Sequence, residues 1–242
     1  MSQAQALRFK RPLIKLSGEA LMGGASYGID AAALQRFAGE IVGCQRLGAE
    51  VGVVVGGGNI YRGLAGAARG MDRVAGDHMG MLATVMNALA LAHAVRAEGA
   101  SARVYSGLSM PAVCRPFQRD DAAADMASGA CVIFAGGTGN PYFTTDTAAA
   151  LRAAEMGCDG LLKATSVDGV YSADPKTDPS ATRYDAVSYA EVLNRNLRVM
   201  DAAAIAIARD NRIPVLIFSL LQAGAIPGAL TGATRATLID GA

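Results

Sequence analysis

Short apolar runs alternate along this chain with longer stretches in which apolar residues recur every three or four positions. Runs of this length, bounded by glycine and polar residues, are typical of buried strands, and the stretches between them are typical of amphipathic helices. The alternation predicts an α/β fold, a single-domain three-layer α/β/α sandwich with a mostly parallel central sheet. The expected strands cover residues 13–16, 51–55, 102–105, 131–134, 160–162, 214–218 and 237–239.

Three of the expected helices have a recognisable first residue. Asp30 is expected to cap a helix that runs to about residue 48, Thr145 a helix that ends near residue 154, and Asp201 a helix that ends near residue 209. Residues 168–184 are expected to form a polar loop with two Asp-Pro turns. Because no linker is long enough to separate domains, residues 1–242 are expected to form one domain.

Residues 79–95 are almost continuously apolar and must be compared with a membrane span. The segment contains Thr84, Asn87 and His93, and it lies at the lower length limit for a transmembrane helix. A helix that is apolar on most of its faces is better explained by burial in a core or between subunits. We therefore expect no membrane association and interpret the segment as an indication of oligomerisation.

Composition excludes several classes of protein. With 22 basic and 21 acidic residues the net charge is +1, which gives no strong attraction to nucleic acid or to an anionic membrane. The four cysteines form no C-x-x-C pair and the chain has two histidines, so the usual zinc spacings are absent and no metal site is expected. Reduced cysteines and an N-terminus without an apolar signal segment predict a cytoplasmic protein.

Three glycine-rich turns follow predicted strands: a first glycine turn at residues 17–19, a second at 56–59 and a third at 136–141. In open α/β sheets, ligands bind beyond the carboxyl ends of the strands, and glycine lets backbone N–H groups approach an anion. A tight chain reversal explains one such turn equally well, whereas three at the same edge favour several phosphate groups. The chain contains neither a P-loop sequence nor the complete dinucleotide fingerprint.

Lysine is rare in this chain, and its placement is informative. Of the 22 basic residues four are lysines, and Lys15 and Lys163 stand at the ends of predicted strands. A lysine ammonium is a compact charge suited to a moving phosphoryl group, although both side chains could instead extend past apolar surface to solvent. Asp146 is expected either to complement a helix start or to orient these lysines or a Mg²⁺ ion.

Longer motifs match a known family. They are Lys-Leu-Ser-Gly-Glu-Ala-Leu (15–21), Val-Gly-Val-Val-Val-Gly-Gly-Gly-Asn (51–59), Gly-Asp-His-Met-Gly-Met-Leu-Ala-Thr-Val-Met-Asn (76–87), Gly-Thr-Gly-Asn-Pro-Tyr-Phe-Thr-Thr-Asp (137–146) and Val-Asp-Gly-Val-Tyr (167–171). From about residue 9 to residue 239 the chain resembles the bacterial UMP kinases of the amino-acid-kinase superfamily. The segment that contains Asp77 is a mark of the nucleotide kinases and is lacking in the amino-acid kinases.

The resemblance implies an amino-acid-kinase-like fold and a kinase that transfers the γ-phosphoryl group of ATP to UMP in pyrimidine nucleotide biosynthesis. It also implies Mg²⁺ with ATP, a cytoplasmic homohexamer, GTP as activator and UTP as inhibitor. The N-terminal part would serve mainly UMP and subunit contacts, and residues from about 160 to 242 mainly ATP. The acceptor would be a phosphate oxygen that is already ionised, so the reaction needs no general base.

The resemblance also assigns residues. The catalytic ones would be Lys15, Asp146 and Lys163. Those at ATP would be Lys15, Leu16, Ser17, Gly18, Gly58, Arg62, Thr165, Tyr171 and Asp174. Those at UMP would be Gly57, Asp77, Thr138, Gly139, Asn140, Pro141, Tyr142, Phe143, Thr144 and Thr145. Those at GTP would be Gly23, Gly24, Ala25, Ser26, Tyr27, Gly28, His93, Arg96 and Arg103.

The chain departs from the family pattern in a few places, and two other functions remain open. Ser166 stands where relatives often carry Lys or Asn, Ala92 where Arg is frequent, and Arg96 where His is frequent. One alternative is a superfamily kinase that acts on a carboxylate or carbamate, against which the Asp77 segment and the third glycine turn argue. The other is a nucleotide-dependent oxoanion storage protein, which shares this fold.

Overall fold

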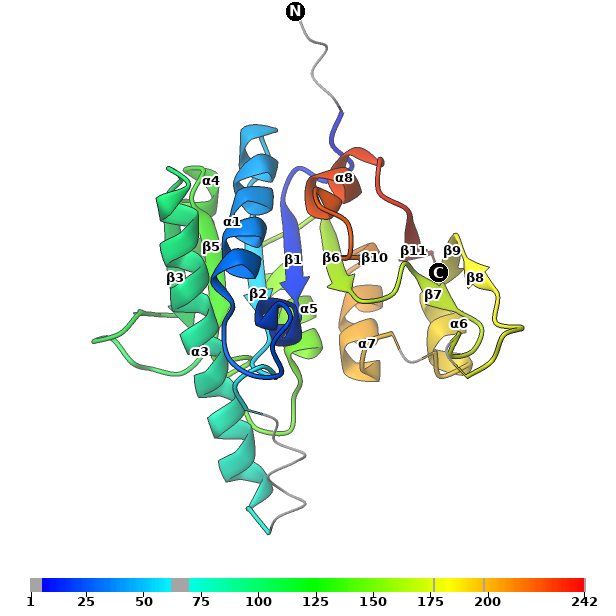
Figure 1. Cartoon of the computed structure of the whole chain (residues 1–242), viewed down its shortest axis with the longest axis horizontal. Helices are drawn as coiled ribbons and strands as arrows, with labels where there is room; N and C mark the ends of the chain where they lie inside the picture. Colours follow the sequence, from blue (N-terminus) through cyan, green and yellow to red (C-terminus); the bar gives the residue numbers. More distant parts are fainter. Residues whose placement is uncertain (1–5, 62–69, 176, 198, 242) are drawn as a thin grey trace, which may run out of the picture.

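A nine-stranded sheet runs through the centre of the molecule (Figure 1). The computed structural model describes residues 6–61, 70–175, 177–197 and 199–241. In spatial order the strands are β4 (Arg115–Pro116), β3 (Ala102–Ser106), β5 (Cys131–Ala135), β2 (Gly52–Val55), β1 (Pro12–Leu16), β6 (Gly160–Thr165), β10 (Val215–Ser219), β11 (Ala236–Asp240) and β9 (Ala186–Ser188). All seven expected strands are present.

Strand direction places most carboxyl ends at one edge of this sheet. Neighbouring strands from β4 to β10 pair in parallel, whereas β11 is antiparallel to β10 and β9 is parallel to β11. The prediction of a mostly parallel sheet is therefore confirmed. The loops that follow β1, β2, β5 and β6 all lie at the same edge, which is the lower edge in Figure 1.

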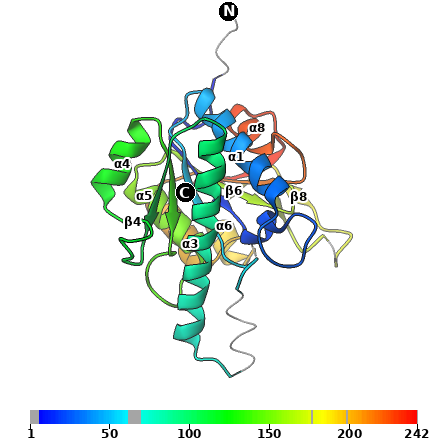
Figure 2. The same cartoon turned by 60° about the vertical axis from the view of Figure 1, so that its left-hand side comes forward.

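Helices cover both faces of the sheet, as Figures 1 and 2 show. One face carries α1 (Ala31–Arg46), α3 (Arg73–Ala97) and α8 (Ala225–Thr231), and the other carries α4 (Arg119–Ala127), α5 (Thr145–Glu155), α6 (Tyr189–Asn194) and α7 (Ala202–Asp210). Successive strand residues point to opposite faces: Ile14 packs with the first set of helices and Leu13 with the second. The expected three-layer sandwich is confirmed.

The long apolar segment, residues 79–95, lies within α3, and the helix begins six residues before the segment does. By length and composition α3 could cross a membrane, but half of the residues in its most apolar stretch are buried inside the protein. The buried apolar residues from Val85 onward belong to the core that α3 shares with α1 and the sheet. We therefore describe α3 as a core helix with one exposed side.

Some local expectations were wrong. The carboxylates of Asp30 and Asp201 do cap α1 and α7, but the cap of α5 is Thr144, whose Oγ1 accepts from the amide of Asp146 at 3.0 Å. Thr145 is instead the first helical residue. The polar loop contains β7 (Val170–Tyr171) and β8 (Arg183–Tyr184), which pair antiparallel and outside the main sheet. A short 3-10 helix, η1 (Gly18–Met22), follows β1.

Candidate active site

The first and second glycine turns are stacked on each other at the carboxyl edge of the sheet. The amide of Gly56 donates to the carbonyl of Leu16 at 2.9 Å. A Cβ atom on Gly18 would lie 2.5 Å from Oδ1 of Asn59 and 2.7 Å from the carbonyl oxygen of Gly56. No side chain fits at this contact, so the close approach requires glycine at position 18.

The third glycine turn follows β5, which pairs with β2, so it lies beside the second. Gly136, Gly137 and Gly139 have φ values of 71°, 58° and 82°. These left-handed conformations favour glycine strongly over residues with a Cβ atom. The three turns therefore form one continuous strip of backbone along the edge of the sheet.

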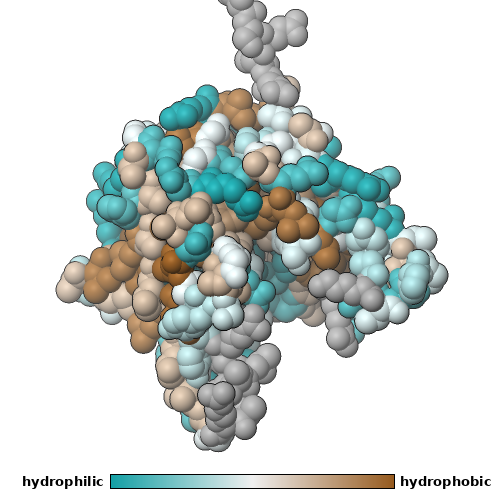
Figure 3. Space-filling model, in the orientation of Figure 1, coloured by the Kyte–Doolittle hydropathy of each residue, from teal (hydrophilic) through white to brown (hydrophobic). Residues whose placement is uncertain are grey.

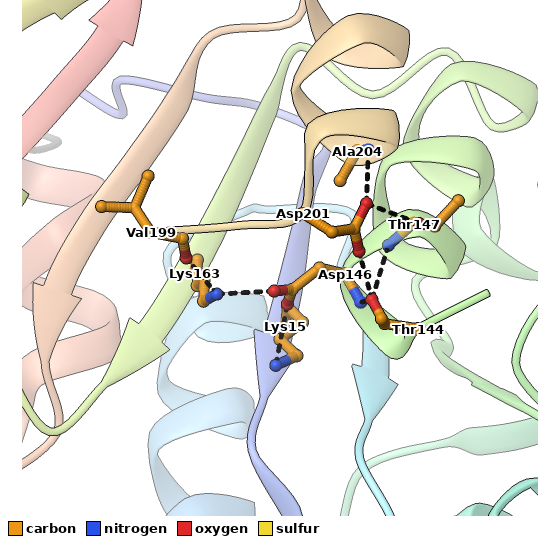
Figure 4. Close-up of polar contacts among 8 residues, drawn as sticks. All are labelled: Lys15, Thr144, Asp146, Thr147, Lys163, Val199, Asp201 and Ala204. Atoms are coloured by element: carbon orange, nitrogen blue, oxygen red, sulfur yellow. Dashed lines mark hydrogen bonds and ion pairs between the residues drawn. The ribbon is translucent and has the colours of Figure 1, made fainter. Parts of the chain in front are cut away.

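Two lysines converge on one carboxylate beside this strip. The ammonium of Lys15 lies 2.9 Å from Oδ1 of Asp146, and that of Lys163 lies 2.7 Å from Oδ2 (Figure 4). Lys15 on β1 is directly opposite Lys163 on β6 in the parallel register, and Asp146 stands in the first turn of α5. The lysine side chains are 10% and 14% exposed, so they do not extend to solvent.

The electrostatics of this cluster follow from its burial. Burial alone would raise the pKa of Asp146, but the charges and hydrogen bonds of Lys15 and Lys163 outweigh it and hold that pKa below its usual value. Burial lowers the pKa of Lys163, an effect that Asp146 opposes and Lys15 reinforces. Two positive charges therefore stay close together because a carboxylate lies between them.

Segments from α5 and α7 hold the cluster in place (Figure 4). Asp201, at the start of α7, accepts hydrogen bonds from the hydroxyls of Thr144 and Thr147, which flank Asp146. Lys163 also donates to the carbonyl of Val199, two residues before Asp201. The sequence indicated Asp201 only as a helix cap, and nothing in it indicated the contact with α5.

A first pocket opens beside the second and third glycine turns, against α3. The residues expected at UMP that line it are Gly57, Asp77, Thr138, Asn140, Phe143, Thr144 and Thr145. Gly58, which is expected at ATP, lines it as well. Gly139, Pro141 and Tyr142 belong to the same loop but do not line the pocket.

Asp77 ties this loop to α3. Its Oδ2 accepts a hydrogen bond from the amide of Tyr142 at 2.7 Å, and Arg73 donates to both of its oxygens at 2.8 and 3.0 Å. The Arg73 guanidinium also lies 5.4 Å from the centre of the Tyr142 ring. Burial raises the pKa of Asp77, but these donors outweigh it and the net shift is downward. Arg73 had no distinguishing signal in the sequence.

The residues expected at ATP lie around the first glycine turn and two further hollows. Tyr171 and Asp174 line a second pocket, which also contains Val199, whereas Ser17 and Thr165 line a third with Ser166. Gly18 forms the contact between turns described above. The side chain of Leu16 is fully buried in the core, so only its backbone is available to a ligand. Arg62 lies outside the described residues.

The residues expected at GTP fall into two separate groups. Residues 23–28 follow η1, and Gly28 exchanges hydrogen bonds of 2.9 Å with Asn59 of the second glycine turn. Arg96 and Arg103 both donate to the carbonyl of Ala102, at the start of β3 and hence near the opposite edge of the sheet. His93 is exposed one turn before Arg96. Ala92 is fully buried, so it does not share their face.

Comparison with known proteins identifies the family to which this chain belongs. A family model described as the amino acid kinase family matches residues 10–219. The uridylate kinase of Agrobacterium fabrum is 55% identical over 231 residues, which cover 96% of each chain. The crystal structure of UMP kinase from Bacillus anthracis superposes with a TM-score of 0.92 at 38% identity over 96% of each chain. The UMP kinase structure from Ureaplasma parvum gives 0.92 at 35% identity and covers 97% of this chain and 100% of that one. The chain belongs to the amino acid kinase family, within its uridylate kinase branch.

Proposed function

We propose that this chain transfers the γ-phosphoryl group of ATP to UMP and forms UDP and ADP. The observation that carries the proposal is the pairing of Lys15 and Lys163 with Asp146. Thr144 and Thr145, just before Asp146, line the first pocket, and Val199, bonded to Lys163, lines the second. The two ammonium groups thus lie where a donor in one pocket and an acceptor in the other would meet.

The chemistry requires positioning and charge neutralisation rather than proton transfer. A UMP phosphate oxygen is ionised at neutral pH and attacks the γ-phosphorus, while the bond from that phosphorus to the bridging oxygen of ADP breaks. Lys15, Lys163 and the N–H groups of the glycine turns stabilise the charge on the transferred group. Asp146 is the group that keeps both ammonium ions aimed at the same point.

On the donor side, the polyphosphate of ATP lies along the first glycine turn, and its adenosine lies toward the C-terminal part of the chain. The residues that we assign to it are Lys15, Leu16 through its backbone, Ser17, Gly18, Gly58, Arg62, Thr165, Tyr171 and Asp174. On the acceptor side, UMP occupies the first pocket. The residues that we assign to it are Gly57, Asp77 and residues 138–145.

Mg²⁺ bound together with ATP would help to neutralise the charge of the phosphate groups during transfer. Mg²⁺ commonly binds through one or two carboxylates together with substrate phosphates. Among the residues that the structure describes, no cluster of three or more His, Cys, Asp or Glu side chains is arranged to hold a metal. The carboxylate of Asp146 is already paired with two ammonium groups.

The functional form is a homohexamer in the cytoplasm, and α3 supplies a subunit contact. Met79, Leu82, Met86 and Leu89 are between 37% and 54% exposed, and their spacing puts them on one side of α3. Figure 3 shows apolar surface toward the left, over α3 and the loop between β3 and β4, and also at the centre of the view, whereas the region of β7 and β8 is mostly polar. Burial of the α3 side against a second copy would remove it from water.

In this proposal, GTP activates the enzyme and UTP inhibits it. The enzyme acts in pyrimidine nucleotide biosynthesis. The cations available to a triphosphate are Arg96, Arg103 and, when protonated, His93. The Nε of Arg103 is buried without a hydrogen-bond partner among the described residues. Residues 23–28 would transmit binding through the bond between Gly28 and Asn59.

A coupled assay of ADP release tests the function. Purified chain with MgATP is given UMP, CMP, dTMP, aspartate or carbamate as acceptor. We expect ADP release with UMP to exceed that with every other acceptor. Faster turnover with carbamate or aspartate would favour another superfamily activity. Bound molybdate or tungstate without UMP-dependent ADP release would favour oxoanion storage.

A further inference from the structure

Helix α3 carries two polar side chains within its buried side, Thr84 and Asn87. They are 3% and 0% exposed, although the helix is otherwise strongly apolar where it meets the core. Their spacing of three residues puts them on the same side of the helix. Burial of polar groups is unfavourable unless each is hydrogen-bonded, so the partners of these two groups are informative.

Asn87 holds the second glycine turn at both of its ends. Its Nδ2 donates to the carbonyl of Gly56 at 2.6 Å and to Oδ1 of Asn59 at 2.7 Å. Asn59 donates in return to Oδ1 of Asn87 at 3.0 Å and is itself 2% exposed. A single side chain from α3 therefore fixes the first and last residues of this turn.

Thr84 holds the third glycine turn at its first residue. Its Oγ1 accepts a hydrogen bond from the amide of Gly136 at 2.8 Å and donates to the carbonyl of Met81 at 2.7 Å. The same part of α3 also touches the second turn, because a Cβ atom on Gly57 would lie 2.9 Å from the Cβ of Ala83. Two adjacent turns of backbone are thus fitted to one stretch of helix.

We propose that Thr84 and Asn87 are positioning residues that set the offset between the second and third glycine turns. The proposal rests on the function proposed above, in which the second turn supplies Gly58 to ATP and Gly57 to UMP and the third turn lies at UMP. Asn87 acts on the donor side as well, because the second turn is stacked on Gly18 of the first. Thr84 acts on the UMP side alone, because it bonds to Gly136 and itself lines the first pocket.

Two substitutions at Thr84 separate positioning from packing. Thr84→Val keeps the shape of the side chain and loses the hydroxyl, whereas Thr84→Ser keeps the hydroxyl and loses the methyl group. Positioning predicts that T84V raises KM for UMP about tenfold with KM for ATP within about twofold of wild type, since small misplacements of a bound group carry large kinetic costs. It predicts that T84S stays close to wild type. A packing role alone predicts the reverse order.

At Asn87 the corresponding change is Asn87→Asp, which keeps the shape but removes both donated hydrogen bonds. Because the second turn contacts both the first turn and the UMP pocket, N87D should lower kcat by about tenfold or more. The matched control is Asn211→Asp, where the amide Nδ2 donates to the carbonyl of Ile207 at 2.9 Å on an exposed helix end. N211D should leave both kinetic constants unchanged.

The experiment measures steady-state kinetics with ATP and UMP varied, UMP binding by titration calorimetry, and thermal unfolding for all four variants. If T84V does not fold, Thr84→Ala replaces it with the same expectation. The proposal is overturned if T84S is impaired as much as T84V, or if T84V and N87D bind and turn over substrates as wild type does. Absence of UMP-dependent ADP release in the wild type would instead refute the proposed function, so the two failures are distinguishable.

Discussion

At the scale of single residues, the carboxylate of Asp146 holds two lysines of like charge close together. Lys15 and Lys163 repel each other, yet the carboxylate between them holds both within hydrogen-bond distance. An incoming polyphosphate adds negative charge to a cluster that carries a net positive charge. The cluster is therefore suited to bind a group whose charge develops during transfer, which agrees with electrostatic preorganisation as the main source of rate.

Lys15→Ala tests this role. We expect kcat to fall by about 10²-fold or more, the scale for loss of one preorganised charge-stabilising donor. Because Asp146 keeps its pair with Lys163, we expect the free energy of unfolding to fall by only about 1–3 kcal/mol. The control is Lys10→Ala, at an exposed position before β1. Turnover of K15A near that of K10A would remove Lys15 from the mechanism.

The pH dependence of kcat tests Lys163. Its lowered pKa means that the ammonium loses its proton, and so its charge, at a lower pH than an ordinary lysine near 10.4. We therefore expect kcat at saturating substrates to decline on the alkaline side below that pH. In Lys163→Arg the guanidinium stays charged throughout, so this decline should disappear even if kcat itself is reduced. An identical alkaline decline in both enzymes would show that another group is responsible.

The sequence predicted the lysines and Asp146 because each stands at a strand or helix end, where local pattern is sufficient. It could not predict the second role of Asp201. That role depends on α7 packing beside α5, a contact between residues 54 or more positions apart along the chain. The same is true of Arg73, whose contact with Tyr142 depends on how the loop after β5 folds back onto α3.

At the scale of elements, two helix caps of the same chemistry differ in what else they bind. Asp30 accepts a hydrogen bond from the amide of Ala33 at 2.7 Å, whereas Asp201 accepts from Ala204 and from two threonine hydroxyls. We expect Asp30→Ala to cost about 1 kcal/mol of unfolding free energy. Asp201→Ala should cost about 2–4 kcal/mol, because it also leaves the start of α5 without its partner.

Urea unfolding of the two variants measures this difference, with D30A as the matched control for loss of a cap alone. D201A should in addition lower kcat, since Thr144 and Thr147 flank Asp146. Equal losses of stability in the two variants would mean that the bond between α5 and α7 contributes nothing beyond the cap.

Elements with a strong apolar period were predictable, and short ones were not. The seven predicted strands lie in short, mostly apolar runs, and α1 has a clear apolar side. In contrast, β7 and β8 are two residues long each, and only their mutual pairing identifies them as strands. Helix α8 contains Pro227 and begins after a glycine in the left-handed conformation, so it lacks the usual signals of a helix start.

At the scale of the whole molecule, α3 joins the interior of the site to the outer surface. Its buried side holds the glycine turns, and its exposed side carries Leu82 and Met86. We expect the double substitution of these two residues by Lys to reduce the mass of the particle in solution, because buried like charges oppose association. The mass is measured by size-exclusion chromatography with light scattering. The control is Leu221→Lys, at a residue that is 77% exposed near the third pocket. An unchanged mass in the double variant would place the subunit contact elsewhere.

Transfer of a labelled phosphoryl group tests the central claim most directly. The chain is incubated with UMP and ATP that carries ³²P at the γ position, and the products are separated by chromatography. The account predicts that the label moves from ATP into the β-phosphate of UDP, with one ADP formed for each UDP, and that Lys15→Ala slows this transfer without changing the product. Label that appears as inorganic phosphate, or remains in ATP in the presence of UMP, would contradict it.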